Sequence, residues 1–347
     1  MKANAIAVSP INGDQRPAWR RVAEQDYGLD AIAVLDERAH YHHHHFLTAR
    51  PGPAWPPGSP GRFVLSRCEP DPLRLPFEHQ FAILSAITER APLPEVAMPR
   101  STVHGAAFAF RSGAHWMLRD HIDHDPDPGW TRPDLVRRAA RLLARLHDRT
   151  ANLGTAGDGL PHLDPERVHA FHWSVAEFTE RIDRFTPPGD QIVRDTIKKL
   201  GEHAGDVLTV TRHELGLHGL THQDFRPQNL LVAPTGTPDA GRIRAVIDWD
   251  LARRDDHLYD MALAALQFGD NRCLGEHADT KLAGVFVDTY LAARGLGDLR
   301  RAHPWLVPWM LRLVVVKRLL TNGPASAPRR IALLKRLGTA EIAHWPG

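Results

Sequence analysis

The feature that most constrains the fold is a change of hydrophobic periodicity near residue 123. Before it, short runs of β-branched and aromatic residues, bounded by Gly, Pro and charged residues, predict strands. These runs are 29–36, 43–50, 61–68, 105–112 and 114–122. One segment, 75–90, has apolar residues at helical spacing instead. We therefore expect three strands, one helix and two strands in the first part of the chain.

After a Pro-, Gly- and Asp-rich stretch at 123–130, helical patterns dominate. They cover 132–150, 172–185, 190–208, 259–269, 280–295 and 306–320. Two strand-like runs, 229–234 and 242–250, predict a hairpin among them. The pattern indicates an α+β fold with two lobes: a small β-rich lobe over 1–122, which includes the start of the linker, and a larger helical lobe over 123–347. Two lobes suit a ligand bound in a cleft between domains.

Composition narrows the classes of partner and compartment. The net charge of the 347 residues is +2 with His neutral, too balanced to favour nucleic acid or a membrane surface. Two cysteines, Cys68 and Cys273, give no disulfide framework and no cysteine-based zinc motif. The first residues lack the apolar core of a signal peptide, and Pro308, Arg312 and Lys317 interrupt the most apolar late segment. We expect a cytoplasmic protein, as a monomer or a homodimer.

Polar residues cluster in "HQDFRPQN", residues 222–229. Pro227 disfavours a helix there, so Asp224 and Asn229 belong to a loop. Nineteen residues after Asn229, an apolar strand runs straight into Asp248, and a carboxylate is costly to bury at such a position without a partner. If the loop and the strand end converge, Asn229 and Asp248 offer oxygen ligands for Mg²⁺, and Asp224 is left to accept a proton from a hydroxyl. This is the arrangement that phosphoryl transfer needs.

These residues carry a resemblance to a known family. "HQDFRPQN" followed by "VIDWD" resembles the His-x-Asp-x-x-x-x-Asn and Ile-Asp-(Phe/Trp)-(Asp/Gly) motifs of the aminoglycoside phosphotransferase/choline kinase family, which has a protein-kinase-like fold. The resemblance covers about residues 28–320, since "ARLLARLHDRT" and "YDMALA" also match family segments. Residues 61–70 and 75–87 are most similar to the homoserine kinase type II branch. The resemblance implies Mg²⁺ and ATP, or GTP, as cofactors.

The resemblance also implies roles for single residues. Asp224 would be the catalytic base, Asn229 and Asp248 the Mg²⁺ ligands, and Asp250 a further metal group. Arg226 is either a surface residue or a charge near a phosphate.

Three further residues would shape the catalytic loop. His222 would support it through hydrogen bonds to nearby backbone, and Asp260 would brace it from the following helix. Gln223 stands where relatives commonly have Gly, which indicates either an altered loop geometry or an added contact to the acceptor.

The expected nucleotide site departs from the usual kinase pattern. Strand 61–68 has Ser66 where kinase-like folds place a phosphate-binding Lys, and alternation sends the neighbouring Arg67 to the opposite face. Members of the homoserine kinase branch also tend to lack this Lys. The His-rich run 42–45 lies where such folds cover the phosphates; a phosphate-binding role and a merely solvated hairpin are both open. The residues expected around the nucleotide are His44, His45, Ser66, Arg67, Glu78, Arg119 and His121.

The function predicted for such a chain is ATP- and Mg²⁺-dependent phosphorylation of a hydroxyl group on a small molecule. The acceptor would be an amino alcohol such as homoserine, or an aminoglycoside- or nucleoside-type antibiotic in a resistance enzyme. Asp255, Asp256 and Glu276 are acidic candidates for contact with a cationic acceptor. The alternative is a catalytically inactive, kinase-like nucleotide-binding protein, which Ser66 and the His run favour. A protein kinase is disfavoured, because the short segment between Asp250 and "YDMALA" leaves little room for an activation loop.

Overall fold

A computed structural model describes residues 16–39, 43–52, 55, 61–68, 77–153, 167–168, 173–174, 191–270, 279–321 and 327–338. The chain forms two compact units. One spans Met1–Leu73 and Met98–His121, and the other spans Arg74–Ala97 and Ile122–Gly347. The helix expected between the third and fourth strands therefore groups with the second unit. The predicted α+β fold class is confirmed, and the domain limits 1–122 and 123–347 stay a prediction.

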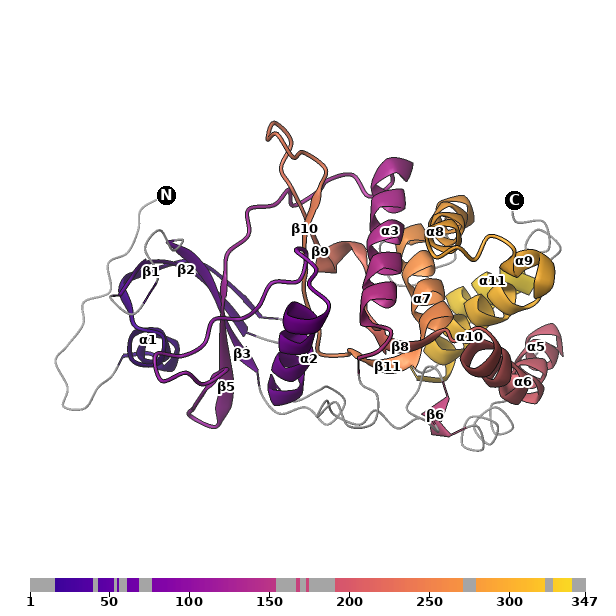
Figure 1. The fold of residues 1–347 in the computed structure, drawn as a ribbon, viewed down its shortest axis with the longest axis horizontal. Coiled ribbons are helices and arrows are strands. Elements are labelled where there is room, and N and C mark those ends of the chain that lie inside the picture. Colours follow the sequence, from indigo (N-terminus) through magenta and orange to yellow (C-terminus); the bar gives the residue numbers. More distant parts are fainter. Residues whose placement is uncertain are drawn as a thin grey trace. The chain divides into compact units, whose positions relative to one another are not determined.

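The first unit is built on a five-stranded antiparallel sheet with the order β1-β2-β3-β5-β4 (Figure 1). Its strands are β1 (Leu29–Ala39), β2 (His43–Pro51), β3 (Arg62–Cys68), β4 (Ala109–Arg111) and β5 (Ala114–Asp120). All five predicted strands are present. The strand expected over 105–112 is shorter because Gly105 has φ +80°, a left-handed conformation that does not continue a strand.

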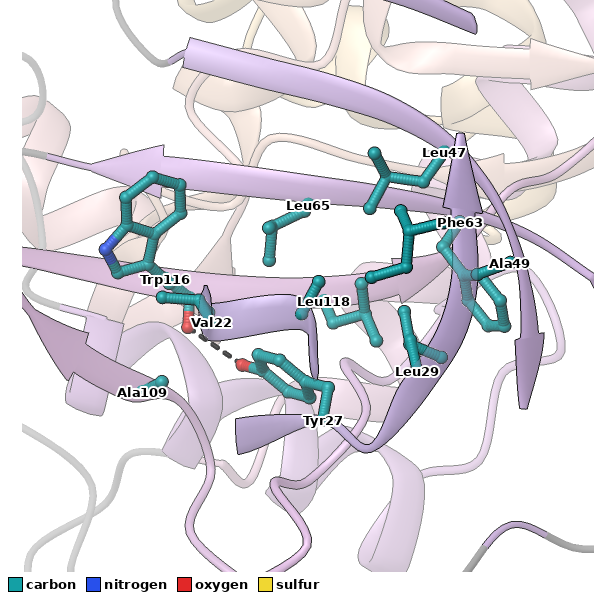
Figure 2. Packing of buried hydrophobic residues seen from close by; sticks show 12 residues of the cluster. Val22, Tyr27, Leu29, Leu47, Ala49, Phe63, Leu65, Ala109, Trp116 and Leu118 are labelled. Carbon is teal, nitrogen blue, oxygen red and sulfur yellow. Dashed lines mark hydrogen bonds between the residues drawn. The ribbon is translucent and has the colours of Figure 1, made fainter. Parts of the chain in front are cut away.

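One face of this sheet packs on the N-terminal helix α1 (Ala18–Arg21) and the π-helical turn Val22–Asp26 (Figure 2). Tyr27 is fully buried there, and its hydroxyl donates to the Trp116 carbonyl over 2.8 Å. Burial raises the pKa of Tyr27 well above its usual value, so this hydroxyl stays protonated. Alternate residues of each strand, such as Phe63 and Leu65 on β3, point into this core. The residues between them therefore lie on the opposite face of the sheet.

The second unit is mainly helical. Its helices are α2 (Phe77–Arg90), α3 (Pro133–Thr150), α5 (Gln191–Glu202), α6 (Ala204–Leu208), α7 (His257–Gly269), α8 (Thr280–Ala293), α9 (Leu299–Ala302), α10 (Leu306–Thr321) and α11 (Ala327–Gly338). The helix expected over 190–208 is divided at His203, between two glycines that weaken a helix. Most of the helix expected over 172–185 lies outside the described residues, and Trp173–Ser174 form strand β7, paired with β6 (Arg167–Val168).

Two short strand pairs carry the loops that matter below. β9 (Leu230–Val232) and β10 (Ile243–Val246) form the predicted antiparallel hairpin. β8 (His218–Thr221) pairs with β11 (Arg253–Asp256), a pair not expected from the sequence. α7 follows β11 directly, because the Asp256 carboxylate caps it by accepting from the Leu258 amide over 2.8 Å. None of the described helices has both the length and the hydropathy needed to span a bilayer.

Candidate active site

The loop between β8 and β9 brings two of the predicted residues into contact. Pro227 starts a 3₁₀ turn that ends at Asn229. The side-chain amide of Asn229 donates to Asp224 twice, to its carbonyl over 2.8 Å and to carboxylate Oδ2 over 2.9 Å. The Asn229 amide group is thereby oriented with nitrogen toward Asp224, which leaves its oxygen as the side-chain atom that can bind a cation.

His222 connects this loop to the end of β10. Its Nε2 lies 3.1 Å from the Ile247 carbonyl, and its Nδ1 accepts from the Asp224 amide over 3.3 Å. These partners define a neutral ring with the proton on Nε2, and burial lowers the pKa of His222 against the opposing field of nearby carboxylates. Because Asp248 directly follows Ile247, one imidazole ring holds the backbone beside both candidate carboxylates.

Asp248 leaves β10 in a strained conformation, with φ +66°. Its carboxylate forms no hydrogen bond or ion pair with any described residue, and Asp250 is buried two residues later. The Ile247 amide donates to the Asn229 carbonyl over 2.9 Å, so the chain segments that carry the predicted metal ligands are joined by a backbone bond. Oxygen donors of this kind fit Mg²⁺, which binds few protein ligands and keeps water and phosphate for the rest. Within the described residues, no group of three or more His, Cys, Asp or Glu is placed to hold a metal.

Asp260, on α7, braces the loop from behind. Its Oδ1 accepts from the Gln223 amide and its Oδ2 from the His222 amide, each over 2.9 Å. The carboxyl group is fully buried, and burial raises its pKa to about 6 although these donors and His222 favour the charged form. The two N–H groups would otherwise be buried donors at the start of the loop, so Asp260 determines the backbone path there.

A second layer of buried polar groups holds Asp260 itself. Nε2 of His147, on α3, lies 3.0 Å from Asp260 Oδ2, and its Nδ1 lies 2.7 Å from the Tyr290 hydroxyl. His147 also stacks on His257, with ring centroids 4.2 Å apart. Burial holds the pKa of both histidines well below the usual range. The sequence offered one signal for this layer, a single His among the buried leucines of 132–150, which we did not assign a role.

Gln223 adopts the left-handed conformation that its position demands. Its φ is +64°, a region that Gly enters freely and other residues rarely. The side chain is buried, with Nε2 donating to the Thr221 hydroxyl over 2.8 Å, and Oε1 has no hydrogen-bond partner among the described residues. Gln223 therefore points into the base of the loop, which agrees with an effect on loop geometry.

Two more side chains hold the Asp224 carboxylate. Arg226 Nε lies 3.0 Å from Oδ2, so Arg226 is an ion-pair partner of this loop. Gln267, buried on α7, donates from Nε2 to Oδ1 over 3.3 Å. Sequence reasoning missed Gln267, because it lies 43 residues from Asp224 and only the packing of α7 brings the two together.

The sheet of the first unit divides the predicted nucleotide-binding residues between its two faces. Ser66 is buried, with Oγ 2.9 Å from His44 Nδ1 on the adjacent strand. β3 pairs regularly with β2 and β5, and this register places Arg119 on the same face as Ser66. The amide of His121, just beyond β5, donates to the Arg62 carbonyl over 2.9 Å. That amide is therefore already used within the sheet.

The opposite face of the sheet carries two more residues of this set, His45 and Arg67. His45 stacks between Trp19 and Trp116, with centroid distances of 5.5 and 6.1 Å, and its Nδ1 lies 3.1 Å from Glu37. Burial lowers the pKa of His45, although Glu37 opposes the shift. Arg67 lies over the Trp116 ring at 5.9 Å. The absence of a register shift along β3 means that no bulge turns Arg67 toward Ser66, as the alternation predicted.

The other acidic candidates fall in different places. Glu78 lies exposed on α2, in the second unit. Asp256 caps α7, and Asp255 is buried and accepts from the Asp256 amide over 2.8 Å, so both carboxylates serve the fold. Glu276 lies outside the described residues.

Comparison with known proteins agrees with this geometry. The model of the phosphotransferase enzyme family (APH) matches residues 57–305. Solved structures with the same fold include the amicoumacin kinase hAmiN in complex with AMP-PNP, Ca²⁺ and Ami (15% identity, TM-score 0.56, covering 94% of this chain and 92% of that chain). They also include the GDP complex of an aminoglycoside 2'-phosphotransferase-IIIa mutant (15%, 0.58, 92% and 95%) and the microcompartment-associated aminopropanol kinase (14%, 0.53, 93% and 94%). No curated protein matches the chain.

The chain therefore belongs to the phosphotransferase enzyme family. The predictions of a protein-kinase-like fold and of a small-molecule kinase acting on a hydroxyl group are confirmed. The assignment to the homoserine kinase type II branch stays a prediction.

Proposed function

We propose that the chain is an ATP- and Mg²⁺-dependent O-phosphotransferase with Asp224 as the catalytic base. One observation supports this most directly: His222 binds the backbone of both Asp224 and Ile247, and Asn229 binds the Asp224 carboxylate. A proton acceptor and two oxygen ligands are thus carried by segments that hydrogen bonds tie together. Asp248 is half-buried and forms no hydrogen bond or ion pair with a described residue, so its carboxylate is available to a cation.

Each residue of this proposal has a distinct task. Asp224 orients the acceptor hydroxyl and takes its proton as the oxygen attacks the terminal phosphorus, while Arg226 and Gln267 fix the rotation of the carboxylate. Asn229 and Asp248, with Asp250 nearby, would hold Mg²⁺. When bound, Mg²⁺ neutralises charge on the transferring phosphoryl group.

The nucleotide part of the proposal rests on the first unit and on the relatives. One relative was solved with AMP-PNP and Ca²⁺, and another with GDP. We propose that the sheet face with Ser66, His44 and Arg119 lies toward the phosphates and that ATP is the donor. His44 and Arg119 would offer the N–H groups that the missing Lys does not.

The acceptor is proposed to be a small amino alcohol such as homoserine, or an aminoglycoside- or nucleoside-type antibiotic. The relatives include an aminopropanol kinase and an aminoglycoside phosphotransferase, which supports both kinds. A cytoplasmic location suits an ATP-consuming enzyme. If the acceptor is an antibiotic, expression of the chain in a sensitive bacterium would raise the inhibitory concentration of that compound alone.

The decisive experiment is ATP consumption against a panel of amino alcohols, aminoglycosides and nucleoside antibiotics. With the best acceptor, Asp224→Asn should lower kcat by about 10²–10⁴-fold while nucleotide binding persists. Asp298→Asn, a matched change at an exposed carboxylate, should leave kcat unchanged. Unaltered turnover in Asp224→Asn would remove Asp224 from the mechanism.

A second variant tests the metal site. Asp248→Ala should abolish Mg²⁺-dependent nucleotide binding, measured by titration calorimetry with and without Mg²⁺; tight Mg·ATP binding in this variant would contradict the assignment. Nucleotide binding by the unaltered chain with no turnover on any acceptor would instead support the inactive alternative that Ser66 suggests.

A further inference from the structure

A separate concave site in the second unit is rich in arginine. The cavity has a volume of about 370 Å³ and lies between α3 and the start of β10. It is lined by Glu95, Arg138, Arg141, Leu142, Arg145, Arg242 and Ile243. None of these residues belongs to the candidate catalytic or metal site.

The charges around this cavity are unbalanced. Among the four arginines that line the cavity, Arg145 forms an ion pair with a carboxylate: its guanidinium donates to Glu95 Oε1 over 2.7 Å. Arg138, Arg141 and Arg242 form no hydrogen bond or ion pair with any described residue. By contrast, Arg100 and Arg244 each form two hydrogen bonds to one carboxylate. Asp134, outside the lining, interacts electrostatically with Arg138, so four guanidinium groups face two carboxylates in all and the local charge stays positive.

The backbone holds part of this cluster in place. Gly241 has φ +74°, and a Cβ there would lie only 2.9 Å from Arg138 NH1. The guanidinium of Arg138 thus rests against the turn, and Arg242 follows as the next residue. Leu142 and Ile243 add apolar surface to the lining, and such surface strengthens the interaction of nearby charges with an anion.

Glu95 ties the site to β10 as well. Its carbonyl accepts from the Val246 amide over 2.7 Å, and its second carboxylate oxygen is buried with no hydrogen-bond partner among the described residues. The acid orients Arg145 toward the cavity without neutralising the other three arginines.

We propose that this cavity binds a compact polyanion that carries two or more phosphate groups. Arginine presents paired N–H donors that match two phosphate oxygens at once, and several arginines around one concave surface suit a ligand with more than one phosphate. The volume is within the range of small-molecule sites. The ligand would contact the start of β10, the strand whose other end leads to Asp248.

The test is titration calorimetry of the full chain with inorganic tripolyphosphate in the absence of Mg²⁺. Arg141→Glu should weaken binding at least about 10-fold, because it replaces a charged donor by a repelling acceptor. Arg137→Glu makes the same charge change one turn away on α3, at a residue that does not line the cavity, and should weaken binding less than about 3-fold through the general field alone. Arg242→Glu, just before β10, repeats the test if the first variant does not fold.

Three outcomes would overturn the proposal. The unaltered chain does not bind tripolyphosphate; or Arg141→Glu and Arg242→Glu both bind it as tightly as the unaltered chain; or Arg137→Glu loses as much affinity as Arg141→Glu. The second outcome would assign the anion to another site, such as that for nucleotide phosphates, and the third would assign it to bulk charge. Kinase turnover of Arg141→Glu at saturating nucleotide reports separately on the proposed function, so the failure of one proposal leaves the other intact.

Discussion

Gln223 permits a sharp test of the loop geometry, because its strain can be separated from its side-chain contacts. We compare Gln223→Gly with Gln223→Ala, which both remove the bond to Thr221 and the buried amide. They differ chiefly in backbone preference at φ +64°. An alanine there retains a left-handed strain of about 1–2 kcal/mol. Glycine relieves this strain but loses about 0.4–1 kcal/mol through the greater entropy of the unfolded chain.

The glycine variant should therefore be more stable than the alanine variant by about 1 kcal/mol. Urea unfolding at constant m-value measures this difference as a shift of the midpoint. Gln228 provides the matched control, since it lies in the same loop without a positive φ. There, alanine should be more stable than glycine. If alanine equals or exceeds glycine at position 223, the loop does not have this conformation in solution and the proposed aim of Asp224 is wrong.

Further predictions concern the layer behind the loop. Asp260→Asn places an N–H group against at least one of the three N–H groups that the carboxylate accepts from, those of His222, Gln223 and His147. It should lower the free energy of unfolding by about 2–3 kcal/mol and also lower kcat. If both quantities match those of the unaltered chain, Asp260 does not hold the loop in place. Because burial depresses the pKa of His147 and His257, each contributes stability that is present above about pH 6.5 and lost at about 1.4 kcal/mol per pH unit below it. Asp260 has the opposite effect on stability, because its pKa is raised to about 6. Its contribution to the free energy of unfolding is present below about pH 4 and is lost as the pH rises through 6. Urea unfolding at pH 5, 6 and 7 should show a net loss on acidification that is shallower in His147→Gln, and equal slopes would refute the linkage. Gln267→Met should lower kcat severalfold with little effect on nucleotide binding, because it frees one Asp224 oxygen; an unchanged kcat would exclude a positioning role.

The parts of the fold that could be predicted are those with strong periodicity. The face of α3 with Leu135, Leu142 and Leu146 is buried, and the alternation on β3 correctly separated Ser66 from Arg67. The pair of β8 and β11 was missed because each strand has four residues, and β11 reads "RRDD", a pattern typical of a solvated loop. Burial of those charges depends on tertiary neighbours, which a local pattern does not contain.

For the candidate site, the motif residues could be predicted because their chemistry is unusual for a loop, whereas their supports could not. His147 and Gln267 look like ordinary helix residues in the sequence, and only the packing of α3 and α7 against the loop gives them partners. Arg226 had two interpretations, a surface residue or a charge near a phosphate, and its ion pair with Asp224 is a contact that neither of them predicted.

The two strained residues of the site lie beside the two atoms that His222 binds. Gln223 precedes the Asp224 amide, and Asp248 follows the Ile247 carbonyl. Each left-handed residue costs on the order of 1–3 kcal/mol, so an unsupported chain would relax there and turn the carboxylates away. The hydrogen bonds of the His222 ring and the Asp260 carboxylate, at a net contribution of about 1 kcal/mol each, are together comparable with the cost of the two strained residues, whereas one such bond is not. The buried histidine and aspartate layers therefore hold the backbone that aims Asp224 and Asp248, in a loop that is itself buried at His222, Asp224 and Asn229.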